Sequence, residues 1–220
     1  MILIDAGHGG KDPGAMTNGL KEKDWNLEVS LHQYEFLKNL GIPCKVTRNA
    51  DVDLTPEKRS ELVKSSGATV CLSNHFNAGG GSGAEVIYSK YTASGFAENV
   101  ANALKKTGMP IRRIFSKEGS NGKDYYFMHR LTGNVETLII EYGFLDSAID
   151  RKKLNVRSFR FQLAEEAALA AVRYIKGDLT RPMYLVQVGA YKEKRRAEEL
   201  REELKKKGYE AFVKQDGKSV

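Results

Sequence analysis

The strongest constraint on the fold is a regular alternation between short apolar runs and longer segments that carry a helical stripe of apolar residues. Five runs have the length and composition of buried strands: residues 2–4, 43–48, 68–73, 85–89 and 136–142. Helical spacing predicts helices over residues 22–40, 56–66, 94–107 and 158–175. Thr55 and Pro56 form a typical helix start, as N-cap and first helical residue. The alternation predicts an α/β domain in which helices cover both faces of a mostly parallel sheet.

The C-terminal part of the chain departs from this pattern. Residues 177–182 have the composition of a linker, so we expect a domain over residues 1–176 and a small unit over residues 183–220. Within that unit, strands are expected over 183–191 and 209–213, with a helix over 192–208. A βαβ unit of this size is too small to bury a core alone. It could dock on another surface, pair with a copy of itself, or be half of a longer module. Residues 109–130 are expected to form an irregular polar loop at the rim.

The composition excludes a disordered or membrane-spanning chain. Hydrophobic residues make up 41% and charged residues 29% of the 220 residues. No apolar run approaches the ~20 residues of a transmembrane helix. The first apolar run leads directly into a glycine turn, so no signal peptide is expected. Cys44 and Cys71 lie in predicted strands, where two buried thiols in a reducing compartment are expected rather than a thiolate metal site.

The net charge of +7 predicts an anionic partner: nucleic acid, a membrane surface or an acidic wall polymer. The basic residues lack the interleaved aromatic residues of a single-strand nucleic-acid platform, which disfavours nucleic acid. The glycine run at residues 79–83 lacks the Lys-Ser/Thr and the helix of a phosphate-binding loop.

Four polar residues stand where predicted strands end or a helix begins. His8 lies between glycines after the first strand, His75 follows the third strand, Glu141 closes a very apolar run, and Glu22 opens the first helix. Two histidines and a carboxylate are a frequent ligand set for catalytic zinc, and a further glutamate can serve as general base. Glu22 could instead be a carboxylate that stabilises the N-terminus of a helix through the helix dipole. His8 could be a loop residue with no functional role. The residues alone therefore indicate a metal hydrolase without settling it.

Other polar residues have two interpretations each. His129 could face a substrate, and His32 falls within a helix and is expected at the surface. Asn77 and Glu85 could lie next to the metal ligands and orient them without binding the metal themselves. Two arginines, Arg48 and Arg59, could contact substrate or serve the structure.

Five stretches resemble the zinc-dependent N-acetylmuramoyl-L-alanine amidases, the cell-wall hydrolases of bacteria and their phages: ILIDAGHGGKDPGA, GLKEKDWNLEVS, TRNADVDLTPEKR, SNHFNAGGGSGAEVIYS and ETLIIEYGFLDS. The resemblance covers residues 1–175. It implies a three-layer α/β/α fold around a six-stranded sheet, zinc on His8, Glu22 and His75, and Glu141 as the catalytic glutamate. Many members have Ile where Asn74 stands and other residues at Phe76; these changes beside His75 could tune substrate fit, but they remove no metal-binding group.

The resemblance also implies a reaction. Water activated by zinc, with Glu141 as general base, would hydrolyse the amide between N-acetylmuramic acid and the L-alanine of the stem peptide in peptidoglycan. The alternatives are a zinc peptidase of the stem peptide and a non-catalytic wall-binding protein on the same scaffold. Without a leader, the protein would be made in the cytoplasm and reach the wall by lysis or a holin-type route.

Residues 183–220 resemble one half of the sporulation-related (SPOR) peptidoglycan-binding module. The expected partners are therefore peptidoglycan and anionic wall polymers, with neither nucleic acid nor a transmembrane segment. An exposed strand edge on a half-module would allow a homodimer through this unit.

Overall fold

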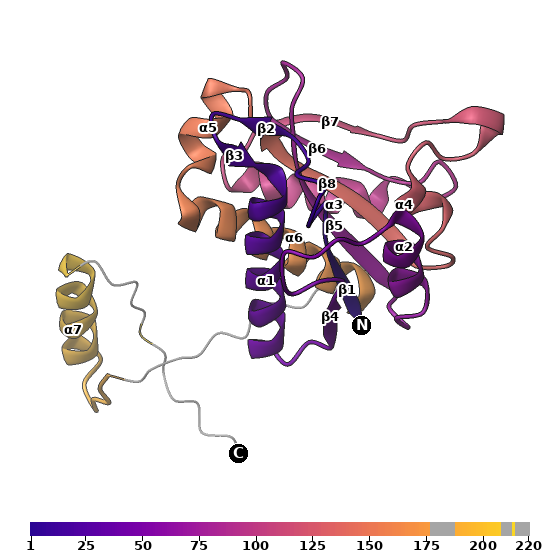
Figure 1. Cartoon of the computed structure of the whole chain (residues 1–220). Coiled ribbons are helices and arrows are strands. Elements are labelled where there is room, and N and C mark those ends of the chain that lie inside the picture. The colour runs from indigo at the N-terminus through magenta and orange to yellow at the C-terminus, as the bar shows by residue number, and fades with distance from the viewer. Residues whose placement is uncertain (177–187, 208–212, 214–220) are drawn as a thin grey trace. The chain divides into compact units, whose positions relative to one another are not determined.

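The computed structural model describes residues 1–176, 188–207 and 213, which belong to two compact units, Met1–Leu179 and Thr180–Val220 (Figure 1). The first unit contains a six-stranded sheet. Its strands lie in the order β4 (Cys44–Val46), β1 (Ile2–Ala6), β5 (Val70–Asn77), β8 (Glu136–Phe144), β6 (Ala84–Ile87) and β7 (Ile111–Phe115). The first four are mutually parallel, β6 is antiparallel to β8, and β7 is parallel to β6. The prediction of an α/β fold with a mostly parallel sheet is confirmed.

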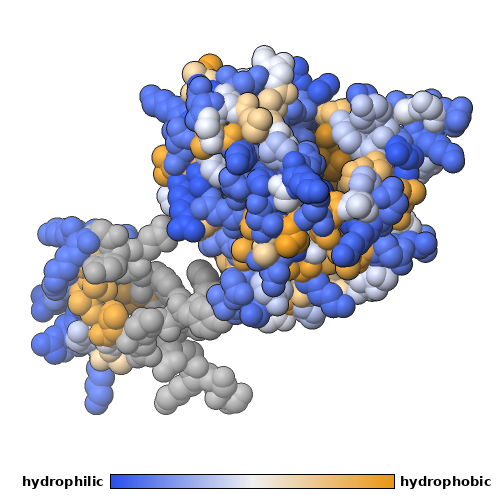
Figure 2. All heavy atoms as spheres, viewed as in Figure 1, coloured by the Kyte–Doolittle hydropathy of each residue, from blue (hydrophilic) through white to orange (hydrophobic). Residues whose placement is uncertain are grey.

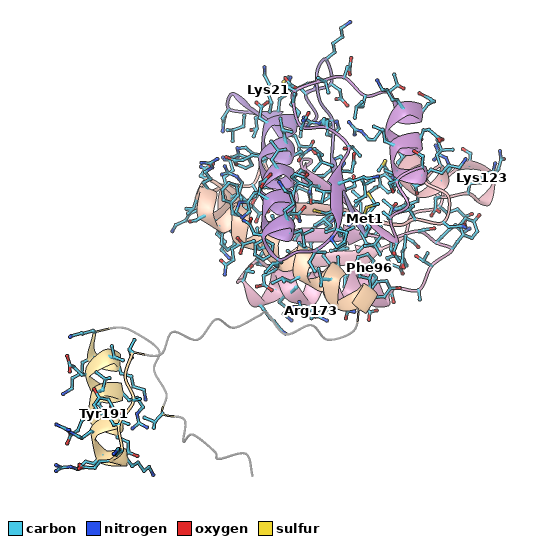
Figure 3. All side chains as sticks on the ribbon, turned by 90° about the horizontal axis from the view of Figure 1, so that it is seen from below. Met1, Lys21, Phe96, Lys123, Arg173 and Tyr191 are labelled. Carbon is cyan, nitrogen blue, oxygen red and sulfur yellow. The ribbon has the colours of Figure 1, made fainter. Side chains whose placement is uncertain are left out.

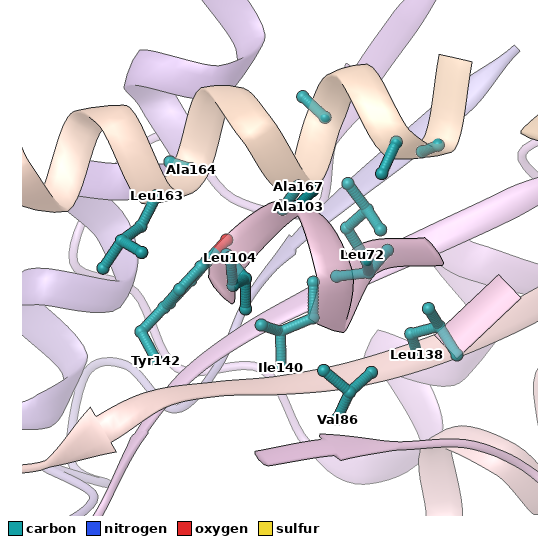
Figure 4. Close-up of a cluster of buried hydrophobic side chains, with 14 of the residues drawn as sticks. Leu72, Val86, Ala103, Leu104, Leu138, Ile140, Tyr142, Leu163, Ala164 and Ala167 are labelled. Atoms are coloured by element: carbon teal, nitrogen blue, oxygen red, sulfur yellow. The ribbon is translucent and has the colours of Figure 1, made fainter. Parts of the chain in front are cut away.

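Helices cover the two faces of the sheet unequally. On one face, α1 (Glu22–Asn39), α3 (Gly95–Lys106) and α6 (Arg157–Lys176) enclose the larger core. Figure 4 shows Leu72, Val86 and Ile140 of the strands beneath α3 and α6. On the other face, the short helices α2 (Pro56–Lys64) and α4 (Phe127–Arg130) cover a smaller cluster that includes Leu3 and Cys71.

The connections between strands reverse direction at the carboxyl ends of β1 and β5. After β1 the chain crosses through α1 to β4 on one side, and it then returns through α2 to β5 on the other side of β1. The carboxyl ends of β1 and β5 therefore lie at a topological switch point, where α/β sheets bind ligands. His8 follows β1, and His75 lies in the last part of β5.

Local sequence signals explain where several elements begin. Thr55 Oγ1 accepts a hydrogen bond from the Lys58 amide at 3.3 Å, and Pro56 is the first residue of α2, as predicted. The hairpin of β2 (Met16–Thr17) and β3 (Leu20–Lys21) turns at Asn18 and Gly19, which both have positive φ and suit a tight two-residue turn. This hairpin leads directly into α1 and so helps to place Glu22.

The prediction of an irregular segment over residues 109–130 is wrong in part, because it contains β7 and α4. The sequence of β7, IRRIF, has two arginines in its centre, which hide the strand pattern. An edge strand tolerates such charges because one side has no partner strand. A loop with a single 3-10 turn (Ser120–Gly122) follows β7, and its Lys123 is labelled in Figure 3. The short helix α5 (Ala148–Leu154) is also absent from the sequence prediction.

Both cysteines are free thiols. Cys71 is buried in β5 as predicted, whereas Cys44 in β4 is only partly buried. The intervening strand β1 separates the two.

In the second unit, the described residues form α7 (Lys194–Lys206), within the predicted helix. The expected linker 177–182 and most of the expected strands 183–191 and 209–213 lie outside the described residues. Hydrophilic side chains make up much of the surface seen in Figure 2. Within the described part of the chain, none of the helices has the length and apolar character needed to cross a membrane.

Candidate metal centre

Three of the four site residues predicted from the sequence meet at the switch point. A ligand atom from each of His8, Glu22 and His75 lies within 4.8 Å of the other two. Glu22 stands between the histidines: its Oε2 is 3.2 Å from His8 Nε2, and its Oε1 is 2.8 Å from His75 Nδ1. The imidazole rings have centroids 5.0 Å apart and are nearly perpendicular. Two nitrogens and one carboxylate oxygen in this arrangement fit Zn²⁺ and leave further coordination positions open.

The turn after β1 orients His8. Reciprocal backbone hydrogen bonds between Gly9 and Asp12 close the turn, and His8 itself has φ +57°. Asp12 Oδ2 lies 2.7 Å from His8 Nδ1, so that this nitrogen is occupied and Nε2 faces Glu22. A carboxylate on the outer nitrogen is the usual support of a metal-binding histidine. Burial lowers the pKa of His8, but the nearby Glu22 and Asp12 carboxylates outweigh this effect and raise it.

Glu22 is a buried carboxylate with a full set of donors. Its side chain is 6% exposed. The amide of Ala15 donates to Oε2 at 2.8 Å, and Asn26 Nδ2 and the Phe76 amide donate to Oε1 at 3.1 and 3.2 Å. Burial acts to raise the pKa of Glu22, but its contacts with His75 and His8 dominate and hold the pKa far below its ordinary value. The group is therefore an anion, as a carboxylate must be to bind a metal.

Two glycines allow the side chains of this cluster to approach one another. A Cβ atom on Gly7 would lie 2.3 Å from His75 Cε1, and one on Gly14 would lie 2.5 Å from Glu22 Oε2. Gly14 also has φ +65°, which disfavours any other residue. The glycines of the stretch ILIDAGHGGKDPGA therefore allow the cluster to pack closely, in addition to forming the turn.

Glu141 lies beside this cluster on the neighbouring strand. It is directly opposite His75 in the parallel β5–β8 pairing. Its Oε2 is buried and has no hydrogen-bond partner among the residues that the structure describes. Burial, reinforced by the carboxylates of Glu22 and Glu85, raises the pKa of Glu141 well above its ordinary value. An unpartnered carboxylate oxygen next to a potential metal site is placed to exchange a proton with a bound molecule.

The two arginines with alternative interpretations serve the structure. Arg48 is buried and donates to the carbonyl oxygens of Ala6 and Gly7 at 3.1 and 3.0 Å. Arg59, also buried, donates to the carbonyl oxygen of His8. Both side chains hold the backbone of the His8 turn, which leaves little of either for a substrate.

The remaining predicted residues lie in different surroundings. Asn77 Nδ2 donates to Glu85 Oε2 at 3.1 Å, so these two interact with each other near Glu141. Burial lowers the pKa of His129 to about 4, and its ring lies 5.8 Å from that of Tyr126. His32 is partly buried, stacked on Phe161 at 3.8 Å and paired with Glu165 at 2.9 Å.

The expectation that Asn74 and Phe76 tune substrate fit is wrong. Both are fully buried on the face of the sheet that carries the larger core. Neighbouring residues of a strand face opposite sides, so His75 points to the site while these two point away from it. Phe76 packs against Trp25 and Tyr142, with ring centroids 5.2 and 5.5 Å away.

Sequence reasoning missed several residues near the site. Asp12 lies four residues after His8 within the same glycine-rich stretch, which was a usable signal. Arg112 and Arg113 contact Glu85 from β7, but only the strand pairing brings them there. Tyr126 is near enough to Glu141 for that carboxylate to raise its pKa, although burial is the larger cause.

Comparison with known proteins links this site to a family of hydrolases. Residues 2–173 match the Amidase_3 family, described as N-acetylmuramoyl-L-alanine amidase, and residues 180–220 match the SPOR domain family. The sporulation-specific N-acetylmuramoyl-L-alanine amidase of Bacillus subtilis is 31% identical over 216 residues, which cover 96% of this chain and 83% of the relative. The N-acetylmuramoyl-L-alanine amidase CwlM of Bacillus licheniformis is 29% identical over 217 residues, with 96% and 83% covered.

A solved structure shows the same fold. The catalytic domain of CwlV, an N-acetylmuramoyl-L-alanine amidase from Bacillus (Paenibacillus) polymyxa var. colistinus, superposes with a TM-score of 0.71 at 27% identity. The similarity covers 80% of this chain and 98% of that domain.

Proposed function

This chain belongs to the Amidase_3 family and is an N-acetylmuramoyl-L-alanine amidase that acts on peptidoglycan, and we propose that it uses one zinc ion and Glu141 to do so. His8, Glu22 and His75 would hold the ion through His8 Nε2, a Glu22 carboxylate oxygen and His75 Nδ1. The observation that carries the proposal is the convergence of these three ligand atoms beside the unpartnered Oε2 of Glu141.

A bound zinc ion would supply Lewis acidity, which acidifies water and polarises the scissile carbonyl. Glu141 Oε2 takes a proton from the attacking water as the new C–O bond forms at that carbonyl carbon. The C–N bond to the L-alanine nitrogen then breaks, and Glu141 returns the proton to this departing amine. The products are a carboxylate on the lactyl group of N-acetylmuramic acid and a stem peptide with a free L-alanine amino terminus.

The remaining side chains keep the ligands in place. Asp12 fixes the tautomer and ring orientation of His8. Arg59 holds the carbonyl of the same residue, and Asp5 stands behind Arg59 with Oδ1 3.7 Å from its Nε. The ligands are therefore oriented before the metal binds, which limits the cost of assembling the site.

The test compares wild type with Glu141→Gln, which keeps the shape and removes the base. We expect both proteins to hold about one zinc by mass spectrometry, and only the wild type to release L-alanine amino termini from purified walls. Glu136→Gln, at the other end of β8, is the matched control and should retain activity. Retained turnover in Glu141→Gln would exclude the proposed base. Release of a different amino terminus by the wild type would indicate a peptidase instead.

For the second unit, we propose binding to peptidoglycan through residues 183–220, after a linker at 177–182. The match of residues 180–220 to the SPOR domain family supports this proposal. Co-sedimentation of the full chain with walls, before and after removal of their anionic polymers, would separate glycan binding from charge attraction. Light scattering on the same sample would test for a homodimer through this unit.

A further inference from the structure

A row of charged side chains extends from the metal centre across the sheet. His75 of β5 pairs with Glu141 of β8, Glu141 pairs with Glu85 of β6, and Glu85 pairs with Arg113 of β7. Paired residues of adjacent strands place their side chains on the same face of a sheet. These four residues therefore lie side by side on the face that carries the site.

Two arginines cover the outer end of this row. The Glu85 side chain is 1% exposed, whereas those of Arg112 and Arg113 are 42% and 51% exposed. Arg112 Nη1 and Arg113 Nε both donate to Glu85 Oε1, the second at 2.7 Å, and Arg113 Nη2 donates to Oε2 at 3.3 Å. The guanidinium groups therefore lie on the solvent side of Glu85.

The arginines exceed what Glu85 needs for neutralisation. Two guanidinium groups face one carboxylate, so this end of the row carries a net positive charge. Each guanidinium has five N–H donors. In the described part of the chain, the donors of Arg112 and Arg113 that do not bond to Glu85 have no protein acceptor, so they are available to an anion from outside.

Aromatic rings hold both guanidinium groups in place. The Arg112 guanidinium lies 5.6 Å from the centroid of the Phe144 ring, and that of Arg113 lies 4.1 Å from the centroid of Phe115. A guanidinium fixed between a carboxylate and a ring loses little further freedom when it binds a second carboxylate. The pair is thus pre-oriented for a planar anion.

The position of the arginines relative to the metal centre selects the part of the substrate that they meet. Glu85 lies two strand spacings from His75, which is about 10 Å. An extended peptide advances about 3.3 Å per residue, so the same distance spans about three residues. We propose that Arg112 and Arg113 form a binding site for a free carboxylate on the second or third residue of the stem peptide. This inference rests on the amidase function proposed above.

The test uses three synthetic muramoyl peptides that differ only in acidity. One has a free carboxylate on the second residue, one has it on the third, and in the last both are carboxamides. We expect wild type to prefer one acidic substrate over the amide by about 10- to 100-fold in kcat/KM, mainly through KM, as a charge-assisted bidentate contact would give. Arg112→Gln and Arg113→Gln should each reduce this ratio at least fivefold.

The ratio between substrates is measured on one protein sample, so a loss of folded protein cancels from it. Arg112→Lys and Arg113→Lys should retain part of the preference, because lysine keeps the charge without the planar fork. Arg157→Gln is the matched control: Arg157 also pairs with a glutamate, Glu28, and lies over a ring, that of Phe161, but on the outer side of the helices. It should leave the ratio unchanged.

Two results would overturn the inference in different ways. Equal cleavage of the acidic and amide substrates by wild type, or an unchanged ratio in both glutamine variants, would refute the carboxylate site alone. Failure of wild type to cleave any of the three at the L-alanine amide would refute the proposed function and this inference with it.

Discussion

Replacing Asn74 with isoleucine should destabilise this protein. Asn74 is fully buried, and its amide nitrogen donates to Ser30 Oγ at 2.8 Å and to Gln33 Oε1 at 2.7 Å. Its oxygen accepts a hydrogen bond from the Tyr142 hydroxyl at 2.8 Å. Isoleucine can neither donate nor accept, so Asn74→Ile would remove all three bonds from the interface between β5, β8 and α1.

The cost follows from the groups left behind. Gln33 Nε2 still donates to the Tyr142 hydroxyl at 3.2 Å and to the Ala164 carbonyl at 2.7 Å, but Ser30 Oγ and Gln33 Oε1 lose the donor that Asn74 supplied. A buried polar group without its partner costs about 1–3 kcal/mol. The added apolar surface of isoleucine offsets part of this, at about 0.8 kcal/mol per buried methylene. We expect a net loss of about 2–4 kcal/mol in the free energy of unfolding.

The assay is urea unfolding followed by far-ultraviolet circular dichroism, at constant zinc. A double-mutant cycle with Tyr142→Phe isolates the hydroxyl contact, and we expect a coupling energy of about 1 kcal/mol or more. Because Asn74 faces away from the site, kcat/KM of the folded Asn74→Ile protein should stay within about twofold of wild type. An unchanged or increased stability of Asn74→Ile, or a coupling energy near zero, would refute this reasoning.

Three further outcomes follow from the structure. Gly7→Ala should weaken zinc binding by about tenfold or more, because the added Cβ would meet the His75 ring. Competition with a chelating dye measures this affinity. Gly95→Ala is the control: its Cβ would meet no atom within 4 Å, so zinc binding should be unchanged. Removal of zinc with a chelator should lower Tm by about 10 °C in calorimetry if the ion otherwise stands at a thousandfold its Kd. His129 has a pKa of about 4 when folded against 6.5 when unfolded, so the unfolded chain takes up the proton first and stability falls as pH drops through this window. Chemical denaturation at pH 7 and pH 4.5 should show that His129→Leu removes about 2–3 kcal/mol of this pH dependence.

Local patterns account for most of the fold that the sequence predicted. Helix α2 could be placed because Thr55 and Pro56 act within one turn, and β1, β5 and β8 because each contains an apolar run, over residues 2–4, 70–72 and 138–140. The strand β7 could not be recognised, because Arg112 and Arg113 occupy its centre. These arginines fit in the strand because they pair with Glu85 of β6, and a local sequence pattern does not reveal that pairing.

The residues of the candidate site likewise divide into those with a local sequence signal and those that only the tertiary structure brings together. His8, His75 and Glu141 are recognisable because each is a polar residue at the end of an apolar run, where burial needs a reason. Asp12 belongs to the same turn as His8 and could have been inferred from it. The charged surroundings of Glu85, by contrast, depend on β6 lying antiparallel to β8, and the reversed direction of β6 and β7 in a mostly parallel sheet has no local signal.

The alternation of side chains along β5 and β8 explains why neighbouring residues have unrelated tasks. His75 and Glu141 face the metal centre, whereas Asn74 and Tyr142, one position away, join the buried network beneath α1. Successive residues of a strand face opposite sides, so the sheet itself separates the polar groups that perform chemistry from those that hold the strands to the helices. A substitution at His75 or Glu141 should therefore alter metal binding or turnover in a folded protein. A substitution one residue away should instead alter stability, and only the strand register distinguishes the two cases.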